Sequence, residues 1–351
     1  MVKLDQALLL GLVLVVEKKD GSMRFCLDYR RLNDKTIKDA YPLPKIDEAL
    51  DQLAGSCYWS CLDLASGYWQ IAMHPDSVPQ TAFCTHMGLF EWLVMPFGLC
   101  NAPAVFERLM DQILKGLQWH DILVYLDDIM AYGKTFDRAL ERLQCVFERL
   151  RLANLKLKPK KCFLLAQEVD YLGHHITRDG VAPLAAKVSA ITHWKEPQNL
   201  GELRSFLDLA CYYQRFVDDY SGIAKPLTEL LKQDVAYEWT PKRQKAFDNL
   251  RSALTQAPCL TFPKADCRFM LDTDASDYAI GGVLSQIQEG EERVIAYYSK
   301  TLNPTQQRYC TTKRELLAVK ACIENWEHFL RLEEFGLRTD HQALKWLSTM
   351  K

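Results

Sequence analysis

Hydrophobic positions in the first third of the chain alternate between short apolar runs and stretches with helical spacing. The runs 12–16 and 24–28 flank Asp20-Gly21, a turn-forming pair, and predict a β-hairpin. Apolar residues within 46–53 recur at helical spacing, whereas residues 58–63 form a strand-like run that ends in an acid. This part of the chain therefore alternates short strands with helices.

The pattern that follows predicts two more strands and a helix. Residues 83–93 are typical of a pair of strands around Met87-Gly88. Pro103 suits the first turn of a helix, because its missing N–H has no partner to lose there. The apolar side chains after it lie on one stripe that should pack on a sheet: Phe106, Leu109, Met110, Ile113 and Leu114.

The second half changes to a helical pattern and then returns to strands. Helix-start signals recur between 188 and 256, among them Asn199 with Glu202 three residues later and Thr240 before Pro241. This region is predicted to be a helical module. Strands are then expected at 268–274, 279–285, 294–299 and 335–340, with a long helix at about 313–329 before the last of them.

Composition fits an ordinary globular protein of two to three domains. The chain has 351 residues, of which 48% are hydrophobic and 25% charged, which excludes disorder and fibrous classes. Its formal net charge of −2 gives no overall attraction to nucleic acid. Any nucleic-acid site must therefore be a local patch.

Cysteine usage and the longest apolar run both indicate a cytoplasmic protein. The 12 cysteines are scattered without a Cys-x-x-Cys pair, so we expect reduced, mostly buried thiols and no structural zinc site. The apolar run 7–16 is about half of what spans a bilayer and no signal-peptide cleavage site follows it, so we expect a buried strand and no membrane segment.

The sharpest local feature is a pair of acids inside residues 122–132. Two apolar, β-prone runs are separated by Asp127 and Asp128, which predicts a hairpin with both acids exposed at its tip. A plain turn explains this segment equally well, because Asp is common in turns. Asp63 ends a run of its own, and three converging carboxylates can hold two Mg²⁺ ions for in-line phosphoryl transfer.

Several long motifs follow one another in an order that resembles one protein family. The resemblance is to the reverse transcriptase of gypsy-type long-terminal-repeat retrotransposons, and the pair Phe97-Gly98 is closer to these elements than to vertebrate retroviruses. The motifs are residues 18–22 (KKDGS), 24–33 (RFCLDYRRLN), 62–71 (LDLASGYWQI), 95–103 (MPFGLCNAP), 125–128 (YLDD), 155–162 (LKLKPKKC) and 171–174 (YLGH).

The resemblance implies a role for individual residues of the polymerase site. Asp63, Asp127 and Asp128 match the catalytic, metal-binding acids, and Tyr68 matches the ring that leaves no room for a ribose 2′-hydroxyl. Fixed cations are expected to grip the triphosphate. Further matches are Lys18 and Arg24 for the incoming nucleotide, Phe97 and Gly98 beside the nascent base pair, and Lys156, Lys158, Tyr171, Leu172 and Gly173 for template and primer.

The C-terminal part resembles the ribonuclease H domain of the same polyproteins. The matching segments are 271–278, 312–318 and 338–344, and they supply three of the four expected catalytic acids, Asp274, Glu315 and Asp340. Thr312 with Glu315 also forms a capping-box pattern, which is the alternative role for this glutamate. The chain stops before the segment that holds the fourth acid in the family, so we expect an incomplete domain whose ribonuclease H activity is feeble or absent.

These observations together predict an α+β chain built as a right-hand polymerase. The expected parts are fingers and a ferredoxin-like palm at 1–175, a helical thumb at 176–256 and an incomplete ribonuclease H-like α/β domain at 257–351. The expected activity is RNA- and DNA-directed DNA synthesis with Mg²⁺, or Mn²⁺ as a substitute, on a template-primer with deoxynucleotides (dNTPs). A catalytically silent retroelement remnant or a domesticated binding module is the alternative. The expected location is the cytoplasm, with retroelement particles and the nucleus left open, as is the oligomeric state.

Overall fold

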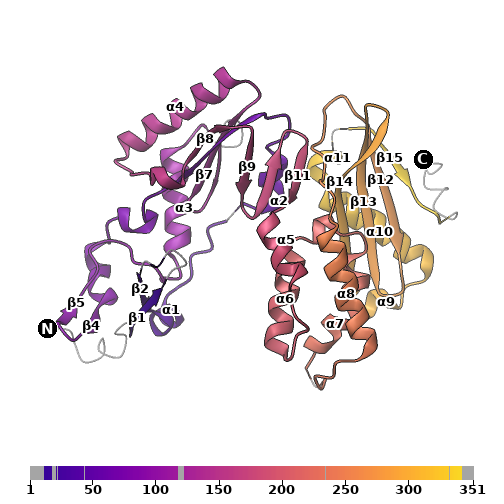
Figure 1. Cartoon of the computed structure of the whole chain (residues 1–351), viewed down its shortest axis with the longest axis horizontal. Coiled ribbons are helices and arrows are strands. Elements are labelled where there is room, and N and C mark those ends of the chain that lie inside the picture. The colour runs from indigo at the N-terminus through magenta and orange to yellow at the C-terminus, as the bar shows by residue number, and fades with distance from the viewer. Residues whose placement is uncertain are drawn as a thin grey trace. The chain divides into compact units, whose positions relative to one another are not determined.

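The computed structural model describes residues 12–17, 21, 23–42, 44–117, 122–233, 235–331 and 333–341. The chain divides into two compact units, Met1–Val169 and Asp170–Lys351, which are considered separately below (Figure 1). The three-part division expected from the sequence, with boundaries at 175/176 and 256/257, stays a prediction. None of the described helices is long and apolar enough to cross a membrane.

The centre of the first unit is a four-stranded antiparallel sheet with the order β6-β7-β3-β8. Its elements follow one another as β-α-β-β-α-β, which is the ferredoxin-like arrangement predicted for a palm. Helices α3 and α4 share one hydrophobic core with the strands, centred on the fully buried Phe106, Met110 and Val146. The elements are β3 (Tyr58–Asp63), α3 (Ala102–Ile113), β6 (Ile122–Tyr125), β7 (Asp128–Gly133), α4 (Phe136–Leu152) and β8 (Phe163–Ala166).

Two hairpins and short helices make up the rest of this unit. The predicted hairpin 12–28 is confirmed, with Leu12 paired to Asp28. Val15 on its first strand is 55% exposed, so the expectation of a buried strand was wrong there. The elements are β1 (Leu12–Glu17), β2 (Met23–Asp28), α1 (Arg30–Lys35), α2 (Ile46–Asp51), β4 (Phe83–Thr85), β5 (Gly88–Phe90) and the 3₁₀ turns η2 (Gly67–Gln70), η3 (Pro75–Thr81) and η4 (Pro159–Lys161).

The second unit begins at Asp170, within the first strand of a small three-stranded sheet, and continues with the predicted helical module. Asn199 caps α6 by accepting a hydrogen bond from the Glu202 N–H at 3.0 Å, and Thr240 precedes Pro241 at the start of α8, as the start signals predicted. The elements are β9 (Glu168–Tyr171), β10 (His174–Thr177), β11 (Gly180–Pro183), α5 (Ala185–Thr192), α6 (Leu200–Tyr212), η5 (Gln214–Phe216), α7 (Tyr220–Thr228), η6 (Glu229–Leu231) and α8 (Pro241–Thr255).

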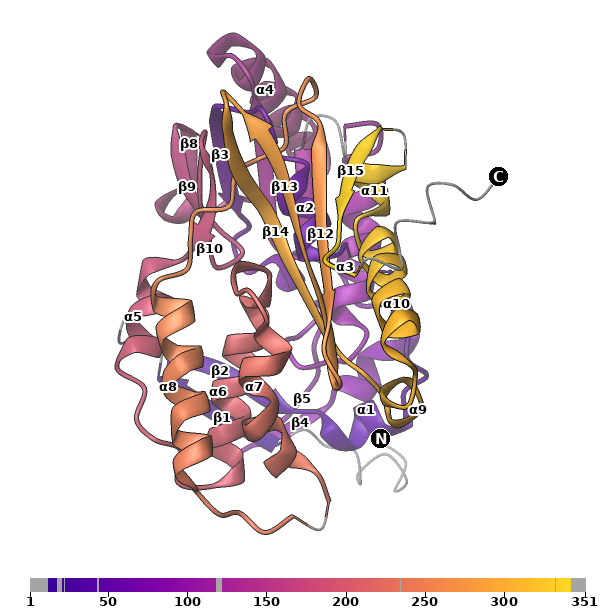
Figure 2. The same cartoon turned by 90° about the vertical axis from the view of Figure 1, so that its right-hand side faces the viewer.

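The last part of the second unit is a four-stranded sheet with the order β14-β13-β12-β15, in which only β15 runs parallel to its neighbour. Helix α10 lies along this sheet, and its buried Ala318 and Cys322 belong to the cores that the strands form (Figure 2). The elements are β12 (Phe269–Ala275), β13 (Ala279–Gln288), β14 (Glu291–Thr301), α9 (Pro304–Gln307), α10 (Thr311–Asn325), α11 (Glu327–Leu330) and β15 (Phe335–Arg338).

Two sequence-based expectations are corrected in this fold. The long helix expected at 313–329 is interrupted at Trp326, whose backbone leaves the helical region while its ring is buried in the core. Burial of this large ring therefore outweighs helix continuity. The cysteines are free, but only Cys322 is buried, so the expectation of mostly buried thiols was wrong.

Candidate functional site

Strand register brings two of the predicted polymerase acids together. Asp63 is the last residue of β3 and Asp128 the first residue of β7, and the two are direct partners in the antiparallel ladder. Directly opposed residues in such a ladder have side chains on the same face of the sheet. The two carboxylates, 65 positions apart in the sequence, therefore share one end of the palm sheet.

Asp127 lies in the two-residue turn between β6 and β7, after Leu126 with its left-handed φ of 53°. The hairpin is confirmed, but its turn is Leu126-Asp127, so the expectation that both acids form the tip was wrong because Asp128 already pairs in β7. The expectation that both acids are exposed was also wrong, because Asp127 is half-buried and only Asp128 is exposed. The Oδ1 atom of Asp127 is enclosed and has no hydrogen-bond partner among the described residues. An added Cβ on Gly67 would come within 3.0 Å of this oxygen, so the residue after Ser66 has to be small.

Burial and like charges make the acids of this site harder to ionise. Partial desolvation raises the pKa of Asp127, and the neighbouring carboxylates of Asp128 and Asp63 add to the shift. The pKa of Asp128 is raised for the same two reasons, with Asp63 as the neighbouring acid. A divalent cation would remove this repulsion, so the donor set and the unbonded Asp127 oxygen fit such an ion.

A lysine that sequence reasoning placed only within a basic stretch reaches this site. The Lys161 ammonium donates a hydrogen bond to Asp63 Oδ2 at 2.8 Å, and this bond is the main reason that the pKa of Lys161 is raised. Lys156 and Lys158 contribute differently: the Lys158 N–H donates to the Asp63 carbonyl, and the Lys156 N–H donates to the side chain of Gln70. Their exposed side chains remain available for the predicted nucleic-acid contacts.

Glu107 on α3 supports the turn that carries Asp127, and sequence reasoning missed it. Its side chain is 2% exposed, and Oε2 accepts a hydrogen bond of 3.0 Å from the Leu126 N–H. Burial raises the pKa of Glu107 to about 7, and Asp111 adds a smaller contribution. The one available signal was its place between Phe106 and Met110, on the apolar side of the helix.

The predicted nucleotide-binding residues Tyr68 and Phe97 lie together near the acids. Their ring centroids are 5.3 Å apart, and Tyr68 also contacts Phe106 with centroids 5.4 Å apart. Desolvation raises the pKa of Tyr68 to about 12, with Asp127 as the next contributor. The phenol of Tyr68 is therefore neutral and held within an aromatic cluster beside the acids.

Gly98 has a structural requirement of its own. Its φ is +97°, and a Cβ there would approach the Leu27 carbonyl oxygen to 3.1 Å. Asn33, which sequence reasoning passed over, donates to the Gly98 carbonyl and accepts from the Cys100 N–H. Of the two predicted triphosphate ligands, Lys18 lies outside the described residues, and Arg24 lies on β2.

The predicted primer-contacting residues form the turn between β9 and β10 in the second unit. Tyr171 is buried, and Leu172 and Gly173 have left-handed φ values of 45° and 71°. Two tyrosines at the end of α6 hold this turn: Tyr212 donates to the Leu172 carbonyl at 2.5 Å, and Tyr213 to the Gly173 carbonyl at 2.6 Å. Sequence reasoning missed both.

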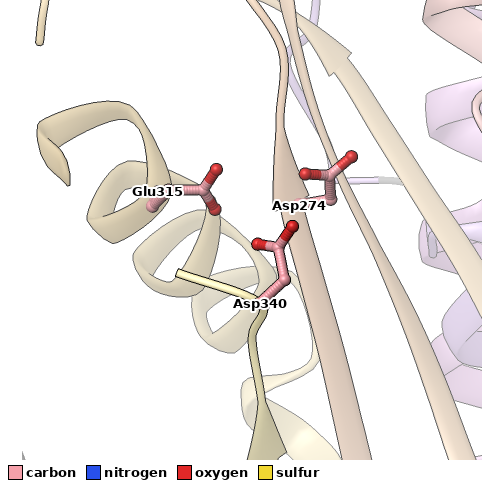
Figure 3. Close-up of side chains that lie close together, drawn as sticks. All are labelled: Asp274, Glu315 and Asp340. Atoms are coloured by element: carbon pink, nitrogen blue, oxygen red, sulfur yellow. The ribbon is translucent and has the colours of Figure 1, made fainter. Parts of the chain in front are cut away.

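The second predicted set of acids meets at one end of the other sheet. Asp274 lies on β12, Glu315 on α10 and Asp340 just after β15, and one carboxylate oxygen from each lies within 4.8 Å of the others (Figure 3). Glu315 is 3% exposed and its Oε2 has no hydrogen-bond partner among the described residues. Burial raises the pKa of Glu315, and Asp274 and Asp340 add to the shift.

The capping-box alternative for Glu315 is wrong. The N-cap of α10 is Cys310, so Thr312 lies inside the helix and not in front of it. The Thr312 hydroxyl instead hydrogen-bonds to the His341 ring at 3.0 Å. Glu315, one turn further along, is free to face the other acids.

The two sites differ in how closely their acids gather. Within the described residues, the group formed by Asp274, Glu315 and Asp340 is the one whose ligand atoms all meet within 4.8 Å. The polymerase acids do not form such a group there, and one oxygen of Asp63 is bonded to Lys161 instead. Carboxylate oxygens are ligands that divalent cations such as Mg²⁺ prefer, so both donor sets suit such ions.

Comparison with known proteins agrees with this geometry. The family model of the reverse transcriptase (RNA-dependent DNA polymerase) matches residues 16–176, and that of the RNase H-like domain found in reverse transcriptase matches residues 239–337. The chain therefore contains a reverse transcriptase domain followed by an RNase H-like domain. Its relatives include the retrovirus-related Pol polyprotein from transposon 297 of Drosophila melanogaster, which is 41% identical over 343 residues, 96% of this chain and 32% of that protein. The predicted resemblance to retrotransposon Pol polyproteins of the gypsy type is confirmed.

Solved structures support the same fold. A foamy viral protease-reverse transcriptase in complex with double-stranded DNA has a TM-score of 0.83 and 26% identity, over 97% of this chain and 60% of that one. The same viral protein in complex with an RNA/DNA hybrid has a TM-score of 0.79, over 97% of this chain and 46% of that one. The predicted α+β fold, a polymerase followed by an RNase H-like domain, is confirmed. The chain spans about a third of the length of two of its Pol polyprotein relatives, from transposons 297 and opus of Drosophila melanogaster.

Proposed function

We propose that this chain is an RNA- and DNA-directed DNA polymerase that extends a primer with dNTPs. The observation that carries the proposal is the placement of Asp63 and Asp128 as ladder partners, beside Asp127 with its enclosed, unbonded oxygen. The foamy viral relatives bound to double-stranded DNA and to an RNA/DNA hybrid support a nucleic-acid partner. No specific observation favours a silent remnant.

The proposed reaction is an in-line substitution at phosphorus. The primer 3′-oxygen forms a bond to the α-phosphorus of the dNTP, the bond to the bridging oxygen breaks, and pyrophosphate leaves while the hydroxyl proton is lost to solvent. Asp63, Asp127 and Asp128 would hold two Mg²⁺ ions, which when bound neutralise charge on the attacking and leaving oxygens. Around them, Glu107 fixes the turn that carries Asp127.

Protein groups would also orient and select the nucleotide. The ring of Tyr68 packs against Phe97 and Phe106, and these contacts support its proposed role in blocking a ribose 2′-hydroxyl. Gly98, fixed by Asn33, keeps the backbone close to the site without a side chain. Lys18 and Arg24 are the proposed triphosphate ligands.

Primer extension on poly-rA with oligo-dT tests the proposal directly. The full chain should extend the primer when Mg²⁺ is present, and Asp127→Asn should lower the rate by at least about a hundredfold, because a metal ligand is weakened. Asp137→Asn, an exposed position on α4, is the matched control and should extend as wild type does. Folded wild-type protein without activity, or an unaffected Asp127→Asn variant, would exclude the polymerase.

The second acidic group favours a second activity in the same chain. Asp274, Glu315 and Asp340 would hold a divalent cation, and the buried, unbonded oxygen of Glu315 supports this assignment. The RNA strand of an RNA–DNA hybrid is the proposed substrate. Cleavage of a labelled hybrid that is lost in Asp274→Asn would support the activity, whereas no cleavage by the metal-loaded wild type would exclude it. The feeble or absent ribonuclease H activity expected from the sequence stays a prediction.

A further inference from the structure

Asp340 reaches the second acidic group from a short segment in which it is exposed and its neighbours Thr339 and His341 are half-buried. Strand β15 ends at Arg338, which pairs with Asp272 of the parallel strand β12. Two residues beyond this pair in each segment come Asp274 and Asp340, whose carboxylates both belong to the acidic group. Residues 339–341 follow the end of β15, so the strand ladder does not itself fix the Asp340 side chain.

Two hydrogen bonds of His341 close this segment around Asp340. The His341 N–H donates to the Thr339 hydroxyl oxygen at 3.2 Å, which forms a small turn with Asp340 at its centre. The His341 ring, through Nε2, meets the Thr312 hydroxyl of α10 at 3.0 Å. The first bond shapes the segment, and the second attaches it to a different element.

The attachment point is significant because Thr312 precedes Glu315 by three residues in α10. Residues at this spacing lie on the same side of a helix. The bond therefore joins the segment that carries Asp340 to the face of the helix that presents Glu315. A helix cap, the alternative role that the sequence offered for Thr312, is already excluded by the position of Cys310.

We propose that Thr312 and His341 form a latch that positions Asp340 against Glu315 and Asp274 for binding of a divalent cation. This inference rests on the proposed metal-binding role of that acidic group. Thr312 and His341 are positioning residues, since neither is one of the three proposed ligands.

Electrostatics explains why such a latch is needed. Three carboxylates within 4.8 Å repel one another before a cation arrives, and two of them, Asp274 and Asp340, are exposed to water. Asp340, two residues beyond the end of β15, is the acid most able to turn away from the group. A hydrogen bond that holds its segment in place reduces the ordering that cation binding would otherwise require.

Manganese titration of the full chain separates the latch from the metal site. Mn²⁺ binding is measured by calorimetry in an Asp127→Asn background, which weakens the polymerase site. The binding that Asp274→Asn removes then reports the second acidic group. Thr312→Val, which keeps the shape but removes the hydroxyl, should weaken this binding roughly tenfold, a typical effect of losing a partner that orients a metal ligand.

Conservative variants distinguish positioning from a general loss of structure. Thr312→Ser keeps the hydroxyl and should bind Mn²⁺ as the parent does, and the exposed neighbour Thr311→Val is the matched control. His341→Ala should repeat the effect of Thr312→Val, and His341→Gln, whose amide can reach the same hydroxyl, should restore most of the affinity. The melting temperatures of these variants should be close to that of the parent.

The possible results lead to different conclusions. If the parent shows no Mn²⁺ binding that depends on Asp274, the proposed metal site itself is wrong. If that binding exists but Thr312→Val and His341→Ala match the parent, the metal site stands and the latch is refuted. If Thr312→Val fails to fold, the His341→Ala and His341→Gln pair decides, because a difference between them supports the latch and equality overturns it.

Discussion

Lys161 and Asp63 form an ion pair across 98 positions of sequence, with 2.8 Å between the ammonium nitrogen and Oδ2. The lysine thus places a positive charge beside an acid proposed to bind metal. Its charge also lowers the pKa of Asp127 and of Asp128, which partly offsets the rise caused by burial and by the neighbouring acids. In the metal-free protein, this ammonium takes over part of the charge balance that a cation would provide. A metal ion that binds through Asp63 Oδ2 would have to displace the Lys161 ammonium from this oxygen.

Lys161→Met should therefore raise the affinity of the free protein for Mn²⁺. The pair is partly exposed, so the gain should be several-fold, in line with about 1 kcal/mol for such a contact. Calorimetry in an Asp274→Asn background measures it. Lys160→Met, from the same 3₁₀ turn but without an acidic partner among the described contacts, should leave the affinity unchanged. Weaker or equal binding by Lys161→Met would show that the lysine does not compete with the metal.

Tyr68 should select the sugar through its ring and not through its hydroxyl. Tyr68→Val removes the ring that contacts Phe97 and Phe106, so incorporation of ribonucleotides relative to deoxynucleotides should rise by about tenfold or more. Tyr68→Phe keeps the ring and should retain the selectivity of wild type. Competitive single-nucleotide incorporation gives both ratios, and equal selectivity in all three proteins would mean that Tyr68 serves packing alone.

Glu107 should make the stability of the chain depend on pH. Its pKa of about 7 in the fold lies above the ordinary 4.5, so between these values the folded chain keeps a proton that the unfolded chain releases. The contribution of Glu107 to the free energy of unfolding is fully present below about pH 4.5 and is lost as the pH rises through 7. The total change is at most about 3 kcal/mol.

Glu107→Gln is expected to remove this contribution, because its amide oxygen can still accept from the Leu126 N–H without a charge. The variant should be more stable than wild type at pH 8 and differ little near pH 4.5. Urea unfolding at several pH values measures the difference, with the exposed Glu148→Gln as control. If the difference in stability between Glu107→Gln and wild type stayed constant from pH 4.5 to 8, Glu107 would not be the group that titrates in this range.

The two tyrosines that hold the β9–β10 turn should contribute unequally to stability. Tyr213 is fully buried, so water cannot replace the hydrogen bond to the Gly173 carbonyl that Tyr213→Phe removes. This variant should therefore lower the free energy of unfolding by about 1 kcal/mol or more. Tyr212 is 40% exposed, and water can replace its bond to Leu172, so Tyr212→Phe should cost less. Thermal unfolding of both variants tests this order, and a larger cost for Tyr212→Phe would contradict it.

The sequence predicted those parts of the site that are encoded locally. The hairpin at 122–132 and the acid at the end of 58–63 follow from alternation and turn chemistry, and both occur in the structure. The helix starts at Asn199 and Pro241 are equally local. The roles of the acids came from the order of motifs that resemble the reverse transcriptases.

Contacts between distant segments could not be predicted in this way. Lys161 belongs to a basic stretch whose other lysines have no acidic partner in the site, and nothing local distinguishes it from Lys160. Glu107 occupies a position on the apolar side of its helix, where an apolar residue is expected. Its hydrogen-bond partner Leu126 is 19 residues away in the sequence. Thr312 matched a capping pattern, and only the tertiary structure places His341 against it.

The register between β3 and β7 constrains where insertions and deletions can occur in this chain. Because Asp63 and Asp128 are brought together by ladder pairing, the loops and helix that separate them in sequence can change in length without moving either acid. A single residue inserted within β3 or β7 would instead turn the next side chains to the opposite face of the sheet. Length variation among homologues is therefore expected in the segment between residues 72 and 94, away from Gly67, Tyr68, Phe97, Gly98 and Glu107, and insertions inside the two strands should be rejected.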